Sequence, residues 1–510
     1  MITKKTKLFF LFVWIVLLTN GQNLQDRIWI FGSSYSGSTN ATLYFGNPSN
    51  PITSLPCGQP NQISASNGVE NWVVATNPFN GNLLFYTDGQ YVYDHFHNVV
   101  DLDPAIPGYE LLGASSSSSQ PAAVVTVPGT IAGQFFVFNN PTGASGLSYS
   151  LGPVTYRIFD AVNETFGPLQ SLPGPYGSID VTEGLKVIQS DADPSTLWLI
   201  TSLYPSTGNE TRYVVYQIQN STITYAGYQD FGPTKQHVDG SLASPIINIA
   251  AAKGGTLYGI TQVAFALQKT SSIYTIQFDN INGQFLPASC RTLTTGIATS
   301  IPGVDYIEFS PNGRFIYYTI YFLTYYLNGL YQVDLQDSTL TSTEIHTFNG
   351  RYAGGLRLAP DGLIYHIHDG GYISHSISVG RILQPDVKYI PGVTVFSSFY
   401  EESFQVYNDC IGYGLCEFLI LSKDLILEKE ELQNKGVSSR ISPNPSNNLI
   451  HFSIEGLQSF DVYNCLGELV EKNVVILDNN YKISSLSPGL YFIRAKTDYG
   501  IIVDKFVKQE

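Results

Sequence analysis

One local pattern occurs six times in the chain: a turn followed at once by a run of aromatic and β-branched residues. The clearest copy is "SPNGRFIYYTI" at Ser310–Ile320, in which Asn312 and Gly313 supply the turn. An Asn-Gly pair before such a run typically starts a strand after a tight turn. The residues before the six runs are spaced by 48 to 62 residues and are Asn82, Gln134, Thr196, Thr256, Arg314 and Gly362. A repeat of this length with several strands per unit predicts a β-propeller, in which four-stranded sheets surround a channel.

The unit at Val304–Phe348 shows the expected internal order most clearly. Its four strands are predicted at "YIEFS", "RFIYYTI", "GLYQVDL" and "EIHTF". The following unit has a third predicted strand at Tyr372–Ile377, and the preceding unit a second strand at Thr256–Thr261. Apolar residues run almost continuously along these strands, as expected when each sheet packs between two others.

Two pairs of strand-like segments remain outside the six units. They are "RIWIFG" with "ATLYFG" near the start, and "VTVFSSFY" with "SFQVYN" at Val393–Asn408. Together they can form a seventh blade that joins the two ends of the body and removes the open edge of the ring. The fold class is therefore all-β: a seven-bladed β-propeller, with six blades and flanking strands as the alternative, followed by a small C-terminal β-sandwich.

The composition fits this fold and excludes one class of partner. The chain has 510 residues, of which 43% are hydrophobic and 13% charged, with 34 Tyr and 29 Phe. Aromatic residues favour half-buried pleated surfaces, and the length allows more than one domain. The formal net charge is −15 and no basic stripe is present, so we expect no nucleic-acid partner.

The N-terminus predicts a secretory signal peptide at residues 1–21. Three lysines precede the apolar run Leu8–Leu18, and cleavage is expected between Gly21 and Gln22. The alternative is a transmembrane anchor, which needs about 20 apolar residues, whereas this run has eleven.

The chain has five cysteines. Cys410 and Cys416 bracket a short Gly-rich loop and are expected to form a disulfide in an oxidising compartment, two unpaired thiols being the alternative. The pairing of Cys57, Cys290 and Cys465 is not fixed by the sequence. No Cys/His spacing typical of a metal site is present.

We predict that the body covers residues 22–416. The composition changes after it: residues 417–440 are rich in charged side chains and are predicted to form a linker. Residues 441–510 contain period-2 strands separated by Asn-Pro, Leu-Gly and Pro-Gly turns, which predict the small β-sandwich.

This tail resembles the C-terminal type A sorting domain of the type IX secretion system of Bacteroidetes. The residues that match the motifs are Pro443, Asn444, Pro445, Gly467, Gly489, Tyr491, Lys505, Phe506 and Lys508. The resemblance implies passage through the periplasm and the outer membrane by the secretion machinery, and removal of the tail by a sortase-like peptidase. It also implies that the body is released or attached to surface polysaccharide.

The body resembles, less sharply, the N-terminal propeller region of large gliding-associated or adhesin-like surface proteins of the same bacteria. "RIWIFG", "NGNLLFYTDGQYVYDHFHNVV" and "VTVFSSFYEESF" carry the resemblance, together with His97 and the serine run Ser115–Ser119. One departure is "SDADPSTLW", where the family has a His before the Trp strand. The resemblance implies no particular biochemical activity.

Four stretches contain residues that could act as metal ligands. His95 with His97, and His366 with His368, alternate and so face one way, but neither pair has a third ligand and both read better as edge or packing histidines. Asp101–Gly108 and Phe278–Phe285 place oxygens near turns, yet lack the twelve-residue calcium loop. We therefore expect no metal and no cofactor.

Three functions stay open for the body. The favoured one is a non-catalytic surface or secreted propeller that binds glycan or protein at a channel-end loop surface. A propeller enzyme acting on polysaccharide or peptide is the first alternative, although no nucleophile elbow or phosphate-binding Gly loop is present. A structural or gliding-associated surface component is the second alternative.

Overall fold

The computed structural model describes the chain from residue 28 to 418 and from 441 to 509, with gaps, and the statements below concern the described residues. Those gaps, apart from short ones, are 32–40, 45–52, 56–72, 77–82, 103–119, 204–210, 232–245, 253–256, 268–271, 295–301, 323–327, 349–352, 370–376 and 407–416 in the body, and 454–456, 465–468 and 476–479 in the tail.

Four sheets in the body each consist of four consecutive antiparallel strands, paired in chain order. The first two are β14 (Val181–Gln189), β15 (Leu197–Leu203), β16 (Thr211–Gln219) and β17 (Thr222–Phe231), then β18 (Ile246–Ala251), β19 (Ile260–Leu267), β20 (Ser272–Asp279) and β21 (Gln284–Thr294). The next two are β22 (Pro302–Phe309), β23 (Phe315–Phe322), β24 (Gly329–Asp334) and β25 (Ser342–Thr347), then β26 (Ala353–Leu358), β27 (Ile364–Asp369), β28 (Ile377–Ile382) and β29 (Tyr400–Val406).

Three further sheets precede these in the chain. The first is β1 (Ile28–Phe31), β2 (Ala41–Tyr44) and β3 (Thr53–Leu55). The second is β4 (Val73–Thr76), β5 (Leu83–Thr87) and β6 (Val92–Asp94), with β30 (Glu417–Phe418) added parallel to β4. The third is β7 (Ala122–Thr126), β8 (Gln134–Asn139) and β11 (Thr155–Asp160), edged by the short β12 (Thr165–Phe166) and β13 (Gln170–Ser171). A separate hairpin joins β9 (Gly143–Ser145) and β10 (Ser148–Ser150).

The repeated turn forms for a local physical reason. Asn312 accepts a hydrogen bond from the backbone N–H of Arg314 at 2.9 Å and one from the Ser310 hydroxyl at 2.7 Å. Gly313 has φ of +68°, a conformation that costs glycine little and most other residues more. The turn thus starts β23 as the sequence predicts.

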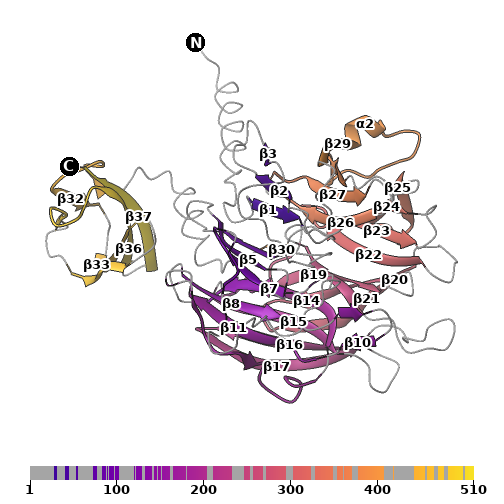
Figure 1. Ribbon diagram of the computed structural model, residues 1–510, viewed down its shortest axis with the longest axis horizontal. Helices are drawn as coiled ribbons and strands as arrows, with labels where there is room; N and C mark the ends of the chain where they lie inside the picture. The colour runs from indigo at the N-terminus through magenta and orange to yellow at the C-terminus, as the bar shows by residue number, and fades with distance from the viewer. Residues whose placement is uncertain are drawn as a thin grey trace, which may run out of the picture.

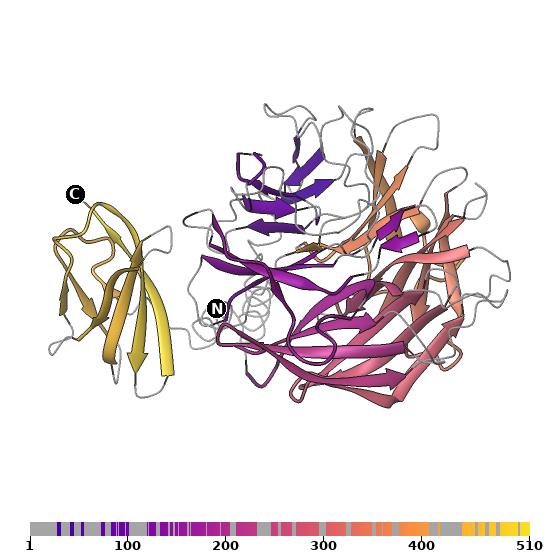
Figure 2. The same cartoon turned by 60° about the horizontal axis from the view of Figure 1, so that its bottom comes forward.

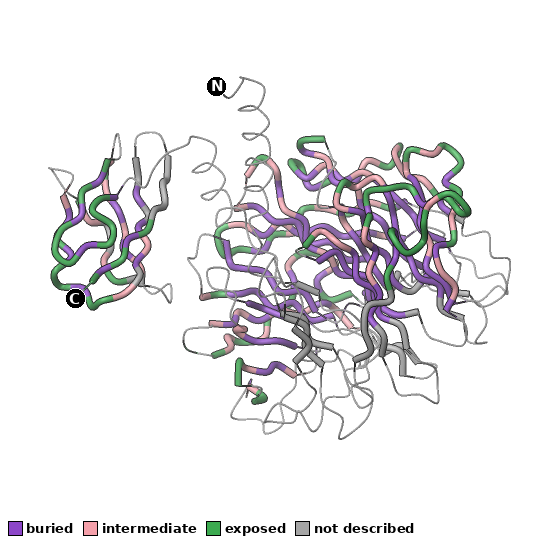
Figure 3. The backbone as a smooth tube through the Cα atoms, turned by 90° about the horizontal axis from the view of Figure 1, so that it is seen from above, coloured by how far each residue is buried: buried purple, intermediate pink, exposed green. Residues whose placement is uncertain are grey.

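The near-continuous apolar runs are explained by burial on both faces of a sheet. Along β8, Phe136 and Phe138 lie in the core shared with the β14–β17 sheet. Phe135 and Val137 lie in the core shared with the β4–β6 sheet. Further apolar cores fill the spaces between the later sheets in chain order, and Figure 3 shows the buried backbone running through the middle of the body.

The sheets follow one another around a common centre. The first strands contact one another in chain order, β4 with β7, β7 with β14, β14 with β18, β18 with β22, and β22 with β26. Figures 1 and 2 show the result: the colour passes around the body from indigo to orange, and the orange β26–β29 sheet lies beside the indigo β1–β3 sheet. The body is all-β and β-propeller-like.

Two details of the predicted strands are wrong, and a third lies mostly outside the described residues. Of the predicted strand Tyr372–Ile377, only Ile377 is described, as the first residue of β28. β19 begins at Ile260, because Leu257 and Tyr258 lie in an exposed turn. The two pairs of remaining segments do not share a sheet: β29 completes the sheet of β26–β28, whereas β1 and β2 pair with β3. The pairing of β29 with β28 was not predicted because seventeen residues, Leu383–Phe399, separate the two strands in the sequence.

The described part of the tail forms two sheets around one core. The first sheet is β31 (Ile441–Ser442), β32 (Leu449–Phe452) and β35 (Asn480–Lys482). The second is β33 (Leu457–Asn464), β34 (Leu469–Val474), β36 (Gly489–Thr497) and β37 (Gly500–Lys508). Side chains from both sheets, including Phe452 and Phe460, make up an apolar cluster formed entirely by tail residues.

Several predicted features lie outside the described residues. These are the signal peptide with Gly21 and Gln22, most of the linker, Cys57, Cys410, Cys416, Cys465, Gly467, His97 and Ser115–Ser119. Cys290 is described, and its thiol is free and partly buried. No helix in the described part of the chain is long and apolar enough to cross a membrane.

Candidate functional site

A buried glutamine side chain joins the first strands of neighbouring sheets. Gln120 lies just before β7 and is fully buried. Its Oε1 accepts hydrogen bonds from the backbone N–H groups of Leu185 and Ile249, each at 3.0 Å. Its Nε2 donates to the carbonyl of Ile249 at 3.1 Å. One side chain therefore joins the first strands β14 and β18, which is a structural role.

A buried ion pair joins two other first strands. Arg357 on β26 lies 3.6 Å from the carboxylate of Glu308 on β22, and both side chains are almost fully buried. The two Glu308 oxygens also accept hydrogen bonds from the backbone N–H groups of Phe309, at 3.0 Å, and Leu358, at 3.1 Å. Because its oxygens are engaged and its charge is paired, Glu308 holds adjacent sheets together and is a poor candidate for acid–base chemistry.

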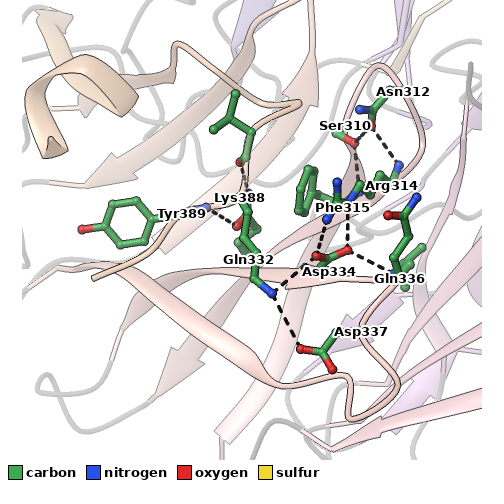
Figure 4. A network of polar contacts seen from close by, with 12 residues as sticks. Ser310, Asn312, Arg314, Phe315, Gln332, Asp334, Gln336, Asp337, Lys388 and Tyr389 are labelled. Atoms are coloured by element: carbon green, nitrogen blue, oxygen red, sulfur yellow. Dashed lines mark hydrogen bonds and ion pairs between the residues drawn. The ribbon is translucent and has the colours of Figure 1, made fainter. Parts of the chain in front are cut away.

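Figure 4 shows a third polar cluster, in which the segment after β28 lies across the β22–β25 sheet. Asp334 accepts two hydrogen bonds from Arg314, at 3.0 and 2.7 Å, and lies 3.5 Å from the ammonium of Lys388. Lys388 is also 3.7 Å from Asp337. The hydrogen bonds from Arg314 lower the pKa of Asp334 below its ordinary value.

Backbone contacts of the same segment make it a strap, which we define as residues 385–389. The Gln332 side chain donates to the carbonyl of Val387 at 2.8 Å and accepts from the N–H of Tyr389 at 2.7 Å. The backbone N–H of Asn312 donates to Asp386 at 2.9 Å. The strap lies in the connection between β28 and β29, and it therefore attaches the β26–β29 sheet to the β22–β25 sheet.

His95, His366 and Asp279 are members of the predicted histidine and turn sites whose contacts are described; His97 and most of Asp101–Gly108 lie outside the described residues. His95 lies against Phe96, with ring centroids 3.8 Å apart. His366 is fully buried and stacks on Phe348 at 4.7 Å. Both oxygens of Asp279 accept hydrogen bonds from Asn282 or Ile281 in its own turn. Among the residues with described positions, no three His, Cys, Asp or Glu side chains gather as metal ligands.

The tail brings together the sequence motifs from its two ends. The Asn444 side chain donates to the carbonyl of Lys505 at 2.8 Å and accepts from the N–H of Val507 at 2.9 Å. Ser446 exchanges backbone hydrogen bonds with Val507 and Gln509, at 2.9 and 2.8 Å. The early Pro-Asn-Pro segment is thereby paired with the terminal strand β37.

The remaining described motif residues surround this junction. Tyr491 stacks on Phe506 with ring centroids 5.4 Å apart and an interplanar angle of 14°. Gly489 lies opposite Lys508 in the pairing of β36 with β37. The two prolines Pro443 and Pro445 are exposed. Motifs separated by about sixty residues of sequence are thus brought together, with Pro443, Asn444, Pro445 and Lys505 exposed and Tyr491, Phe506 and Lys508 buried.

The comparison with protein families agrees with the sorting domain predicted for the tail. Residues 440–509 match the secretion system C-terminal sorting domain. The match supports the predicted type IX sorting domain, which implies interaction with the type IX secretion machinery and export to the cell surface or secretion. The chain is therefore a type IX-secreted protein with a β-propeller-like fold. The comparison with curated proteins gave no match.

Several solved structures resemble the chain at low sequence identity. A protein from Lactobacillus plantarum is 12% identical with a TM-score of 0.44, covering 77% of this chain and 99% of that one. A quinoprotein alcohol dehydrogenase-like protein from Bacteroides thetaiotaomicron is 10% identical with a TM-score of 0.36, covering 71% and 74%. An α-L-arabinofuranosidase from Fusarium graminearum, in complex with an iminosugar inhibitor, is 9% identical with a TM-score of 0.35, covering 76% and 92%. These weak likenesses carry no statement about the chemistry of this chain.

The sequence analysis missed the polar contacts at the centre of the body. Gln120 follows a serine run, and Glu308 and Arg357 lie next to apolar residues in their first strands. A charged residue within a strand buried on both faces is the signal that could have identified the ion pair, because such a charge needs a partner. The partner itself lies 49 positions away and is set by the arrangement of the sheets.

Proposed function

We propose that this protein is a non-catalytic binding protein of the cell surface or the secreted fraction, built as a seven-bladed propeller with a β-sandwich sorting module. The observation that carries the export step is the sorting-domain match over residues 440–509, together with the pairing of its first and last motifs. The further expectations are a signal peptide, removal of the tail by a sortase-like peptidase, and release or attachment to surface polysaccharide. The proposed ligand is a glycan or a protein.

The number of blades is supported by the sheets of the body. Within the described residues it contains seven sheets of three or more strands. The pairing of β30 with β4 brings the end of the body back to its beginning. This contact shields part of an otherwise open sheet edge, which is the physical reason for joining the two ends of such a ring.

Binding is favoured over catalysis by the engagement of the polar groups near the ring centre. Gln120 and Glu308 are buried and tied to backbone groups of neighbouring sheets. A catalytic carboxylate pair needs access to substrate. The resemblance to gliding-associated or adhesin-like surface proteins that is expected from the sequence of the body fits a surface role of the same kind.

The export step is tested by deleting Ser442–Glu510 in a bacterium that has the type IX system. Because the tail core contains tail residues alone, the body should still fold. We expect the truncated body to accumulate in the periplasm, measured by fractionation and by protease accessibility on intact cells. A full-length Tyr258→Ala variant, altered in an exposed turn of the body, serves as the control and should be exported normally. Full surface display of the truncated chain would refute the assignment.

A further inference from the structure

A cluster of aromatic and paired charged side chains lies at the outer edge of the β14–β17 sheet. We call it the Tyr228 platform and define it as Tyr176, Tyr225, Tyr228, Arg212 and Asp230. The preceding sheet ends in β12 and β13, of two residues each, whereas β17 has ten. Tyr176 and Tyr225 are partly buried and pack against the core between the two sheets, whereas Tyr228 keeps 45% of its surface exposed. The exposed ring of the platform is therefore that of Tyr228.

Arg212 holds the platform in a fixed geometry. Its Nε and Nη2 donate to the two oxygens of Asp230 at 2.8 and 2.7 Å, and its Nη1 donates to the Tyr176 hydroxyl at 3.0 Å. The guanidinium carbon lies 4.1 Å from the centre of the Tyr228 ring. A planar guanidinium fixed by a bidentate pair is a rigid support for a stacked ring.

The other tyrosines complete the rigid surface. The Tyr176 ring lies 5.3 Å from Tyr228 in an edge-to-face arrangement and 5.9 Å from Tyr225. Gly174 packs on Tyr225 so closely that a Cβ there would lie 2.7 Å from the Tyr225 Cβ. The platform side chains would therefore lose little conformational freedom when a ligand binds. Preorganised sites of this kind have a smaller entropic cost of binding.

Stability alone does not account for this arrangement. An ion pair as exposed as Arg212–Asp230, with its two side chains 36% and 32% exposed, contributes little to stability. Tyr176 and Tyr225 pack against the core between the sheets, but Tyr228 is exposed, unlike buried core tyrosines such as Tyr213 and Tyr317. An aromatic ring stacked on a fixed polar pair and open to solvent is typical of a binding surface.

We propose that the Tyr228 platform binds a neutral glycan, an assignment that rests on the proposed binding function and gives it a location. The C–H face of a sugar ring stacks on an aromatic ring, and its hydroxyls pair with planar donors and acceptors such as Arg212 and Asp230. The charge of Arg212 is already neutralised, and the chain carries a net charge of −15, so an acidic polymer is disfavoured. A protein partner normally covers about 800 Å² on each side, far more than five side chains provide.

The test uses the full mature chain on an array of neutral and acidic glycans, followed by titration with the best-binding neutral oligosaccharide. We expect wild type to bind neutral glycans and Tyr228→Ala to weaken binding by about tenfold or more. Tyr228→Phe keeps the ring and should stay within about threefold of wild type, because stacking needs the ring and not the hydroxyl. Tyr258→Ala removes a more exposed tyrosine, in the turn before β19 and outside the platform, and should leave binding unchanged. Thermal melting of each variant confirms folding.

The contrary outcomes separate the site from the function. Neutral-glycan binding that survives Tyr228→Ala would overturn the platform while leaving the binding function intact. Binding of acidic glycans alone would overturn the assigned ligand class. Equal loss in Tyr228→Phe and Tyr228→Ala would overturn stacking as the mechanism. Absence of glycan binding by the wild-type chain would overturn both the platform as a binding site and the proposal that the ligand of this protein is a glycan.

Discussion

Two sheets of the body contain the same kind of bidentate arginine–aspartate pair in different surroundings. In the β22–β25 sheet, Arg314 forms a bidentate pair with Asp334, and in the β14–β17 sheet, Arg212 forms one with Asp230. The strap, which includes Lys388, lies over Asp334, whose side chain is 6% exposed. The Asp230 side chain is 32% exposed, and Arg212 lies against the exposed Tyr228 ring.

The difference shows how surroundings change the role of one pair. A covered carboxylate must keep its partners, because an unpaired buried charge is costly, so Asp334 serves stability. An exposed pair contributes little stability, and its rigid planar groups are free to position a ligand. Substitutions in the two pairs should therefore separate stability from binding.

The largest stability effect is expected for Asp334→Ala. This change leaves Arg314 without its bidentate partner and Lys388 with Asp337 alone, and it weakens the contact of the strap with the sheet. We expect a loss of about 2–3 kcal/mol in the free energy of unfolding, measured by chemical denaturation, with glycan binding unchanged. Asp230→Ala is the matched control and should cost about 1 kcal/mol or less. Equal losses in the two variants would contradict the comparison.

A smaller effect, on binding alone, is expected for Arg212→Lys. Lysine keeps the positive charge but lacks the planar fork that contacts Asp230, Tyr176 and the Tyr228 ring. We expect a threefold to tenfold loss in glycan affinity, equivalent to about 0.7–1.4 kcal/mol, and a melting temperature close to that of wild type. Arg314→Lys is the control in the covered pair, where stability should fall and binding should persist. If both variants weaken binding alike, the platform has no special role.

The pH dependence of stability should report on the Arg314–Asp334 pair. The hydrogen bonds from Arg314 lower the folded-state pKa of Asp334 below its unfolded value of about 4. The unfolded chain therefore takes up a proton first as pH falls. The contribution of Asp334 is complete above about pH 4 and is lost as pH falls through the lower folded-state pKa. Denaturation of wild type and Asp334→Asn at pH 7 and near pH 3 should show a smaller difference at the lower pH, and a constant difference would contradict the proposed cause.

The sequence predicts the elements of the fold better than their partners. The Asn312-Gly313 turn and the strands around it are local, and so they are visible in the pattern of turn and apolar residues. The place of β29 depends on the excursion that carries the chain back to β28, and no local signal encodes that return. The sorting motifs were predicted one by one, but the hydrogen bonds between Asn444 and the β37 backbone follow only from the folded tail.

The smallest effect tests the edge of the covered cluster. Lys388 lies 3.5 Å from Asp334 and 3.7 Å from Asp337, but 43% of its side chain is exposed. Water and salt screen such a charge, so Lys388→Ala should lower the free energy of unfolding by about 0.5 kcal/mol or less. The strap is fastened mainly by backbone contacts to Gln332, which this variant keeps. A loss as large as that of Asp334→Ala, measured in the same denaturation series, would mean that Lys388 fastens the strap and that the bidentate pair is secondary.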